Sequence, residues 1–88
     1  MPWTCRFSES AKRELSKLDR QAQKDIVAYI ENRLVTNEEP RRFGKPLKAD
    51  LAGLWRYRVR DYRILCQIKD DVLLILVVSV GHRKNVYD

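Results

Sequence analysis

The chain has 88 residues, of which 44% are hydrophobic and 34% are charged, and its formal net charge is +6 at pH 7. This length suits one small domain, and residues 1–88 are expected to form it. The sequence contains neither the run of about 20 apolar residues that a membrane span needs nor the apolar segment of a signal peptide. We therefore expect a cytoplasmic protein that does not act in the membrane.

The first predicted elements are a strand and a short helix. Residues 3–7 alternate between apolar and polar side chains, which is the pattern of a strand. Ser8 or Ser10 can cap the helix that follows. The apolar positions of this helix recur at helical spacing, and they are Ala11, Leu15 and Leu18. The charged residues between them, Glu14 included, are expected to face outward.

A second helix is predicted directly after the first. Asp19 is its N-cap candidate, and its apolar stripe runs from Ala22 to Leu34 over about four turns. The helix is expected to end before Pro40, which cannot continue it. Because hardly any linker separates the two helices, they should form an antiparallel hairpin whose apolar stripes are covered by a sheet.

Residues 41–53 are predicted to form a loop. Leu47 and Leu51 are its only obvious apolar anchors. The residues that punctuate the loop are Gly44, Pro46 and Gly53.

Residues 54–68 predict two antiparallel strands joined by a two-residue turn at Arg60 and Asp61, because apolar and polar side chains alternate on both sides of that turn. One face of the pair is then apolar. The opposed residues on this face are Val59 with Tyr62, Tyr57 with Ile64, and Trp55 with Cys66.

The other face of the same hairpin carries arginines. Arg58 is expected to lie directly opposite Arg63, and Arg56 one step further along opposite Leu65. Like charges that oppose each other destabilise a strand pair, and arginines add nothing to a core. An anionic partner would explain why these residues lie together.

The last strand is predicted over residues 72–80, which are apolar on both faces, and Gly81 is expected to end it. The order is strand, helix, helix and a three-stranded meander. The predicted fold class is therefore α+β, with a helical hairpin on one face of a four-stranded, mostly antiparallel sheet.

The excess positive charge is confined to one quarter of the chain. Residues 41–63 contain eight lysines and arginines and two acids, whereas the rest contains ten of each. A chain whose positive and negative charges balance outside one cationic region suggests an anionic partner such as RNA, DNA or an acidic protein. Cys5 and Cys66 are expected to be buried thiols, because two distant cysteines and one histidine do not make a zinc site.

The candidate site is an arginine cluster joined by side chains from the end of the chain. Arginine binds phosphate through two parallel hydrogen bonds, Tyr87 can stack on a base, and His82 titrates near neutral pH. The predicted site residues are Arg56, Arg58, Arg63, His82, Arg83 and Tyr87. Further electrostatic contributions to RNA binding are expected from Lys45, Lys48, Arg60 and Lys84. The arginine face carries no carboxylate, so neither a metal ion nor another cofactor is expected.

The motifs along the whole chain resemble those of the RelE/ParE superfamily of bacterial toxins from type II toxin–antitoxin systems, and most closely its RelE branch of mRNA interferases. The residues that carry the resemblance are 7–18, 46–47 with 53–59, 61–64, and 78–87. The resemblance implies a RelE-like fold and a ribosome-dependent endoribonuclease that cleaves mRNA in the ribosomal A site through attack by the 2′-hydroxyl.

The resemblance also implies roles for single residues. Arg63 matches the arginine that holds the phosphate, and Arg83 matches the proposed general acid. Tyr87 matches the tyrosine proposed to stack on the base and activate the 2′-hydroxyl. Arg56 and Arg58 stand where RelE proteins often have lysines, and arginine lacks the lysine's ability to change protonation state. The identity of the general base is therefore open.

The implied partners are the ribosome with its mRNA and an antitoxin whose acidic, disordered segment wraps the toxin. Autoregulatory DNA binding through the antitoxin is a further expectation. Two alternatives stay open at this point. One is a ParE-like inhibitor of DNA gyrase, and the other is a non-catalytic module that binds RNA or an antitoxin.

Overall fold

In the computed structural model, which describes residues 2–82, five strands form one mixed sheet in the order β1-β5-β4-β3-β2. The strands are β1 (Thr4–Phe7), β2 (Lys45–Pro46), β3 (Leu54–Val59), β4 (Tyr62–Lys69) and β5 (Leu74–His82). β1 runs parallel to β5, and every other neighbouring pair is antiparallel. The fold is therefore α+β, as predicted.

Both predicted helices are present and begin at predicted caps. They are α1 (Glu9–Ser16) and α2 (Arg20–Tyr29), and a π-helical segment, η1 (Ile30–Leu34), continues α2. The Ser8 Oγ accepts a hydrogen bond from the Ala11 N–H at 3.1 Å, and the Asp19 Oδ1 accepts one from the Ala22 N–H at 2.7 Å. Each cap satisfies an N–H group that the first turn of a helix leaves without an intrahelical partner.

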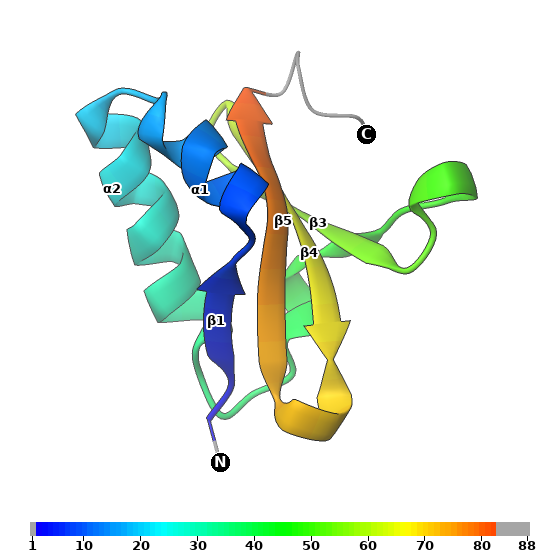
Figure 1. Ribbon diagram of the computed structural model, residues 1–88. Helices are drawn as coiled ribbons and strands as arrows, with labels where there is room; N and C mark the ends of the chain where they lie inside the picture. The colour runs from blue at the N-terminus through cyan, green and yellow to red at the C-terminus, as the bar shows by residue number, and fades with distance from the viewer. Residues whose placement is uncertain (1, 83–88) are drawn as a thin grey trace.

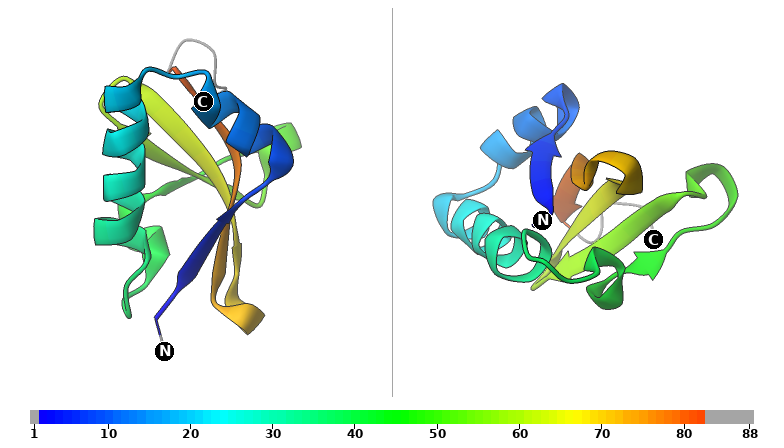
Figure 2. Two further views of the ribbon diagram at one scale, coloured as in Figure 1. Left: turned by 60° about the vertical axis from the view of Figure 1, so that its left-hand side comes forward. Right: turned by 90° about the horizontal axis from the view of Figure 1, so that it is seen from below.

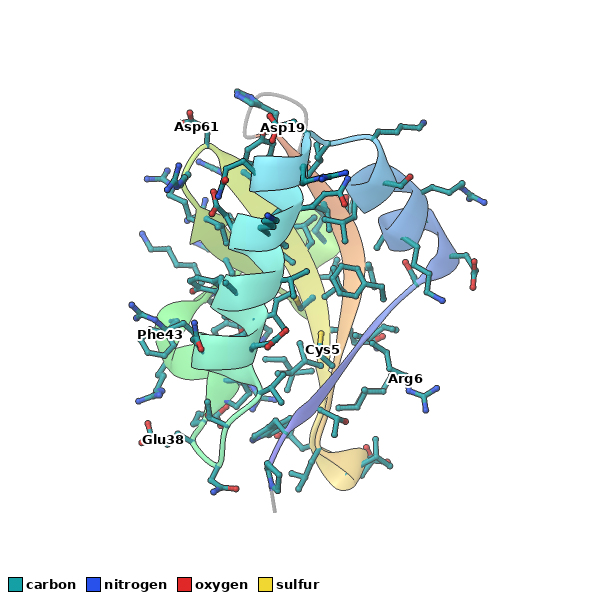
Figure 3. All side chains as sticks on the ribbon, turned by 90° about the vertical axis from the view of Figure 1, so that its left-hand side faces the viewer. Cys5, Arg6, Asp19, Glu38, Phe43 and Asp61 are labelled. Carbon is teal, nitrogen blue, oxygen red and sulfur yellow. The ribbon has the colours of Figure 1, made fainter. Side chains whose placement is uncertain are left out.

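The main core lies between the helices and one face of the twisted sheet (Figures 1 and 2). The helices contribute Ala11, Ile26, Ile30 and Leu34, and the strands contribute Tyr57, Val59, Ile64, Cys66, Ile75, Val77 and Val80. Figure 3 looks onto this helical side and shows Cys5 between β1 and α2. Within residues 2–82, no helix is long and apolar enough to cross a membrane.

The β3–β4 hairpin has the predicted register. Arg58 pairs with Arg63, Tyr57 with Ile64, and Arg56 with Leu65. Residues 60–61 form the turn, and Arg60 adopts a left-handed backbone with φ of 56°. A positive φ at the first of two turn residues is typical of a type II′ turn, whose twist matches that of the strands it joins.

The sheet differs from the prediction in having five strands instead of four. β2 lies within the segment predicted as loop, and there Lys45 pairs with Arg56. A strand of two residues is too short to produce an alternation in the sequence, so only its pairing with β3 reveals it. The last strand also differs from the prediction, because it begins at Leu74 and continues through Gly81 to His82.

The loop before β2 is tied to the sheet by a close backbone approach. The Tyr57 hydroxyl donates a buried hydrogen bond to the Pro40 carbonyl oxygen at 2.9 Å. A Cβ atom at Gly44 would lie 2.9 Å from the Tyr57 ring, so only glycine fits there without a shift. The short helical turn η2 (Pro40–Phe43) is thereby held against β3.

Candidate cationic site on the open face of the sheet

Four cationic side chains lie on the sheet face opposite the helices. Because side chains alternate along a strand, the burial of Tyr57 in the main core sends its neighbours on β3 to the other face. Arg58 and Arg63 oppose each other there, and Lys45 on β2 opposes Arg56. Directly opposed Cα atoms on antiparallel strands are about 4.5–5.5 Å apart, so the four cations come from one compact patch of backbone. We call Lys45, Arg56, Arg58 and Arg63 the cationic row.

Burial differs along the cationic row. Arg58 is exposed and Arg56 is half-buried, whereas Arg63 is only 3% exposed. On its other side Arg63 lies opposite Gly81 of β5, which contributes no side chain. Charged residues are rarely buried to this extent. The row therefore combines one buried cation with more exposed ones beside it.

A second apolar cluster flanks the cationic row on the same face. It contains Leu47 and Leu65, with Leu51, Leu54 and Val78 packed against them. The two predicted anchors of the loop, Leu47 and Leu51, therefore do pack where the loop meets the sheet. This segment includes the 3₁₀ turn η3 (Ala49–Leu51) and stands out on the β3 side of the sheet (Figure 1).

His82 lies apart from the cationic row. It pairs with Tyr62 in the β4–β5 register, and the two rings contact edge to face with centroids 5.7 Å apart. Tyr62 packs against the main core, so His82 lies on the helical face of the sheet and Arg63 on the opposite one. The structure does not bring the predicted histidine together with the predicted arginines.

The other residues predicted to bind or cleave RNA lie at different places in the molecule. Lys48 is exposed just before η3, on the segment that follows β2. Arg60 at the hairpin tip forms an ion pair with Asp25 of α2, with its Nε 3.3 Å from Oδ2, so it is directed toward the helices. Three predicted residues lie outside the described residues, and they are Arg83, Lys84 and Tyr87.

The chemistry of the open face is that of an anion site. The strand positions that share this face with the cationic row carry neutral side chains, such as those of Leu65 and Gln67, together with Lys69 and, on β1, Arg6. Among residues 2–82 no group of three or more His, Cys, Asp or Glu side chains is arranged to hold a metal ion. Paired guanidiniums bind the two free oxygens of a phosphodiester and remain charged at any working pH.

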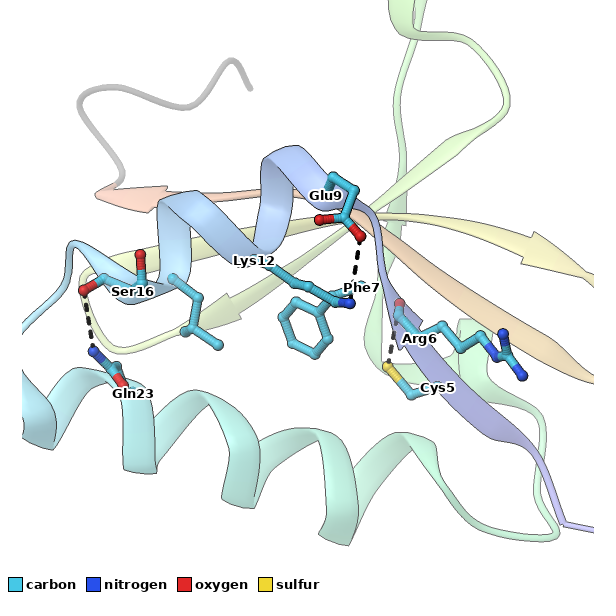
Figure 4. A pocket seen from close by; sticks show the side chains of 8 residues that line it. Cys5, Arg6, Phe7, Glu9, Lys12, Ser16 and Gln23 are labelled. Carbon is cyan, nitrogen blue, oxygen red and sulfur yellow. Dashed lines mark hydrogen bonds and ion pairs between the residues drawn. The ribbon is translucent and has the colours of Figure 1, made fainter.

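A groove lies on the other side of the molecule, between α1, α2 and β1 (Figure 4). It has a volume of about 650 Å³. Its lining residues are Cys5, Arg6, Phe7, Glu9, Lys12, Leu15, Ser16 and Gln23. Within the described residues β1 is the edge strand of the sheet at this groove. The groove therefore offers an apolar floor, an open strand edge and the Glu9–Lys12 ion pair at its rim. Alternation along β1 sends the Arg6 side chain away from the core residues Cys5 and Phe7, to the other face of the sheet.

The family is shown by comparison with known proteins. A sequence model of the family described as the ParE toxin of the type II toxin–antitoxin system parDE matches residues 5–87. The protein named toxin RelG from Mycobacterium tuberculosis is 37% identical over 87 residues, which cover 99% of this chain and 98% of that protein. The chain is a RelE/ParE superfamily toxin.

Other comparisons agree with this family. Toxin RelE from M. tuberculosis is 30% identical to this toxin over 86 residues, covering 98% of this chain and 87% of that protein. A chain in the crystal structure of the toxin–antitoxin complex RelBE2 from M. tuberculosis is 36% identical, with a TM-score of 0.85, and covers 94% of this chain and 100% of that one. Isolated E. coli RelE shares the fold with a TM-score of 0.72 and 21% identity, covering 91% of this chain and 83% of that one.

One polar residue of the toxin was wrongly predicted to face outward. Glu14 is half-buried, and its carboxylate accepts a hydrogen bond from the backbone of β5. The sequence contains a sign of this position, because Glu14 lies three residues after Ala11 and four before Leu18, which places it beside the apolar stripe of α1.

Proposed function

We propose that the toxin is a ribosome-dependent endoribonuclease that cleaves mRNA in the ribosomal A site and so inhibits translation. The observation that carries this proposal is the cationic row, in which Arg58 and Arg63 oppose each other beside Arg56 and Lys45. Four cations on one sheet face, flanked by apolar side chains, suit an RNA backbone. The relatives named RelG and RelE support the same reading.

The proposed reaction is an internal phosphoryl transfer. The 2′-oxygen of a nucleotide attacks the adjacent phosphorus, the bond from phosphorus to the 5′-oxygen breaks, and a cyclic phosphate and a free 5′-hydroxyl remain. The arginines stabilise the negative charge that develops on the phosphorane oxygens. Because guanidinium and ammonium groups repel a metal ion, the row performs this task without one.

Two proton transfers accompany this step. A general base must start without the proton that it takes up, and arginine is already protonated at working pH, so Arg56 and Arg58 bind the phosphate and do not act as the general base. By family likeness Tyr87 takes the proton of the 2′-hydroxyl and Arg83 supplies one to the 5′-oxygen. His82 has no part in the proposed reaction, because it lies on the face that carries Tyr62.

The antitoxin is the second proposed partner. A RelBE2 toxin–antitoxin complex is among the similar structures, and the toxin's net charge of +6 favours an acidic partner. We place an apolar and acidic segment of the antitoxin in the groove between α1, α2 and β1, where Phe7 and Leu15 form the floor and Lys12 supplies a cation at the rim. Autoregulatory DNA binding would then come from the antitoxin of such a complex.

The test is primer extension on mRNA in a purified translation system. Wild-type toxin should produce codon-aligned breaks with cyclic phosphate ends when ribosomes are present, and none on the same naked mRNA. A supercoiling assay with purified DNA gyrase runs in parallel, because a ParE-like inhibitor would stop that reaction. Intact mRNA at every toxin concentration would contradict the proposal, and gyrase inhibition would then favour the ParE-like function.

A further inference from the structure

Among residues 2–82, no strand pairs with the second half of β5 on the β1 side. β1 ends at Phe7, and the Ser8 N–H donates the next hydrogen bond to the Val77 carbonyl oxygen at 2.9 Å. β5 nevertheless continues to His82. Val80, in this second half, is only 2% exposed, so its N–H cannot rely on water for an acceptor. A buried N–H without an acceptor is costly, and the fold has to supply one.

Glu14 supplies this acceptor from α1. Its Oε1 accepts the hydrogen bond of the Val80 N–H at 3.0 Å. A carboxylate forms a stronger hydrogen bond than a neutral acceptor does. The helix that carries Glu14 is itself fixed, because Ser8 caps its first turn and Ala11 is fully buried. The carboxylate therefore takes the place of the missing neighbouring strand.

This hydrogen bond lies next to the candidate site. Val80 pairs with Ile64, and the next residue, Gly81, pairs with Arg63. Arg83 follows His82 directly in the sequence. A change in the position of Val80 would therefore move both the strand beside Arg63 and the point from which the chain continues to Arg83.

We propose that Glu14 is a positioning residue, which locks the end of β5 against β4 and so aligns the site for cleavage. The catalytic consequence rests on the proposed endoribonuclease function, whereas the locking of β5 does not. If Glu14 only stabilised the fold, its loss would lower the melting temperature and loosen the whole sheet to the same extent. A positioning role instead confines the effect to the end of β5 and to the cleavage step.

Three variants separate these roles. Glu14→Gln keeps an oxygen acceptor and removes the charge, while Glu14→Leu removes the acceptor and keeps a side chain of similar size. Arg13→Gln is the matched control, because Arg13 is an exposed charged residue on the same helix. Amide hydrogen exchange is measured for each variant, together with kcat and KM for mRNA cleavage on the ribosome.

Glu14→Leu should raise the exchange rates of Val80 and Gly81 about tenfold or more relative to those of Ile75, because one buried N–H loses its acceptor. Its kcat should fall about tenfold, because the catalytic groups are misaligned. Its KM should change little, because the groups that bind the mRNA remain in place. Glu14→Gln should restore most of both properties, and Arg13→Gln should resemble the wild type.

Unchanged exchange at Val80 in Glu14→Leu would overturn the proposal. So would a rise that is uniform over β5, or a loss of cleavage that Glu14→Gln does not restore. If the wild type itself cleaves no mRNA, the endoribonuclease function fails, and the exchange rates still decide whether Glu14 locks the end of β5.

Discussion

Single side chains on β3 are assigned to opposite faces by alternation alone. Trp55, Tyr57 and Val59 were predicted to face the core, and all three pack in it or against it. The predicted pairing of Arg58 with Arg63 is also confirmed. The length of the hairpin turn fixes this register, because a slip of one residue would expose the apolar face. Sequence reasoning is therefore accurate wherever a short turn and a strict alternation coincide.

Sequence reasoning fails where contacts between distant segments determine the position of a side chain. Glu14 was predicted to face solvent because its side chain is charged, yet it accepts a hydrogen bond from Val80, 66 residues further along the chain. His82 was grouped with the arginines because it follows the last strand in sequence. In the structure β5 extends to His82, and alternation then sends its ring to the side of Tyr62. The helical spacing of Glu14 indicates that it lies beside the apolar stripe of α1, but no pattern in the sequence identifies the partner of either residue.

Tyr57→Phe should lower the free energy of unfolding by about 1–3 kcal/mol, because the buried Pro40 carbonyl loses its hydrogen-bond donor. Urea denaturation measures this difference. Tyr62→Phe is the matched control, since its ring can keep the contact with His82. Equal stability of Tyr57→Phe and the wild type would show that the hydroxyl does not hold η2 against β3.

The two thiols should be unreactive in the folded protein. Burial raises the pKa of the Cys5 thiol from its ordinary value of 9.0 to about 11, and burial also raises that of Cys66. The thiolate is the reactive form, so alkylation of Cys5 by iodoacetamide at pH 8 should be roughly 100-fold slower than that of a free thiol. Mass spectrometry measures the rate, and urea should restore it. Rapid modification in the native state would contradict this prediction.

At the scale of elements, the segment before β2 is held by a charged clamp. Arg41 donates hydrogen bonds from Nη1 to Glu39 and Asp70 and from Nη2 to Asp70, which links η2 to the turn between β4 and β5. Its guanidinium carbon also lies 5.8 Å from the centroid of the Trp55 ring. This part of the chain was predicted as loop, because it is held by polar contacts between residues far apart in the sequence and has no apolar pattern.

The clamp should make stability depend on pH. The hydrogen bond from Arg41 lowers the pKa of Asp70 from its ordinary value of 3.8. A carboxyl whose pKa is lowered by folding stabilises the fold above its ordinary pKa, and this contribution is lost as pH falls through the lowered value. Asp70→Asn should therefore be less stable than the wild type at pH 7, and the difference should shrink below pH 3.8.

Urea denaturation over a pH series tests this prediction, with Asp71→Asn as the matched control on the same exposed turn. A difference between Asp70→Asn and the wild type that is the same at every pH would show that the ion pair is not its source. A deficit of equal size in Asp71→Asn would show that the turn, and not the clamp, is sensitive to charge.

At the scale of the whole molecule, the toxin has two separate surfaces. The cationic row lies on the open face of the sheet, and the groove lies between α1, α2 and β1. The fold class and the helical hairpin were predictable from the sequence. The fifth strand and the groove were not, because a two-residue strand and a gap between elements have no sequence pattern.

Because the two surfaces are separate, we expect a variant in the groove to lose antitoxin binding and keep mRNA cleavage. Lys12→Glu should weaken binding of the cognate antitoxin about tenfold or more, because it reverses the charge at the groove rim. The same variant should cleave mRNA at the wild-type rate. Binding is measured by isothermal titration calorimetry, with Arg20→Glu, a charge reversal at the start of α2, as the control. Loss of cleavage together with binding would contradict the separation.

The most direct test of the cationic row compares arginines on opposite sides of the sheet. Cleavage rates of Arg58→Ala and Arg63→Ala are measured on ribosome-bound mRNA beside those of Arg60→Ala, whose native side chain pairs with Asp25 on the helical side. The two row variants should lose about 100-fold or more in kcat, because phosphorane stabilisation is lost. Arg60→Ala should stay within about threefold, because it removes only a largely exposed ion pair. Equal losses in all three variants, or full activity in the two row variants, would contradict the assignment of the phosphate site to the open face of the sheet.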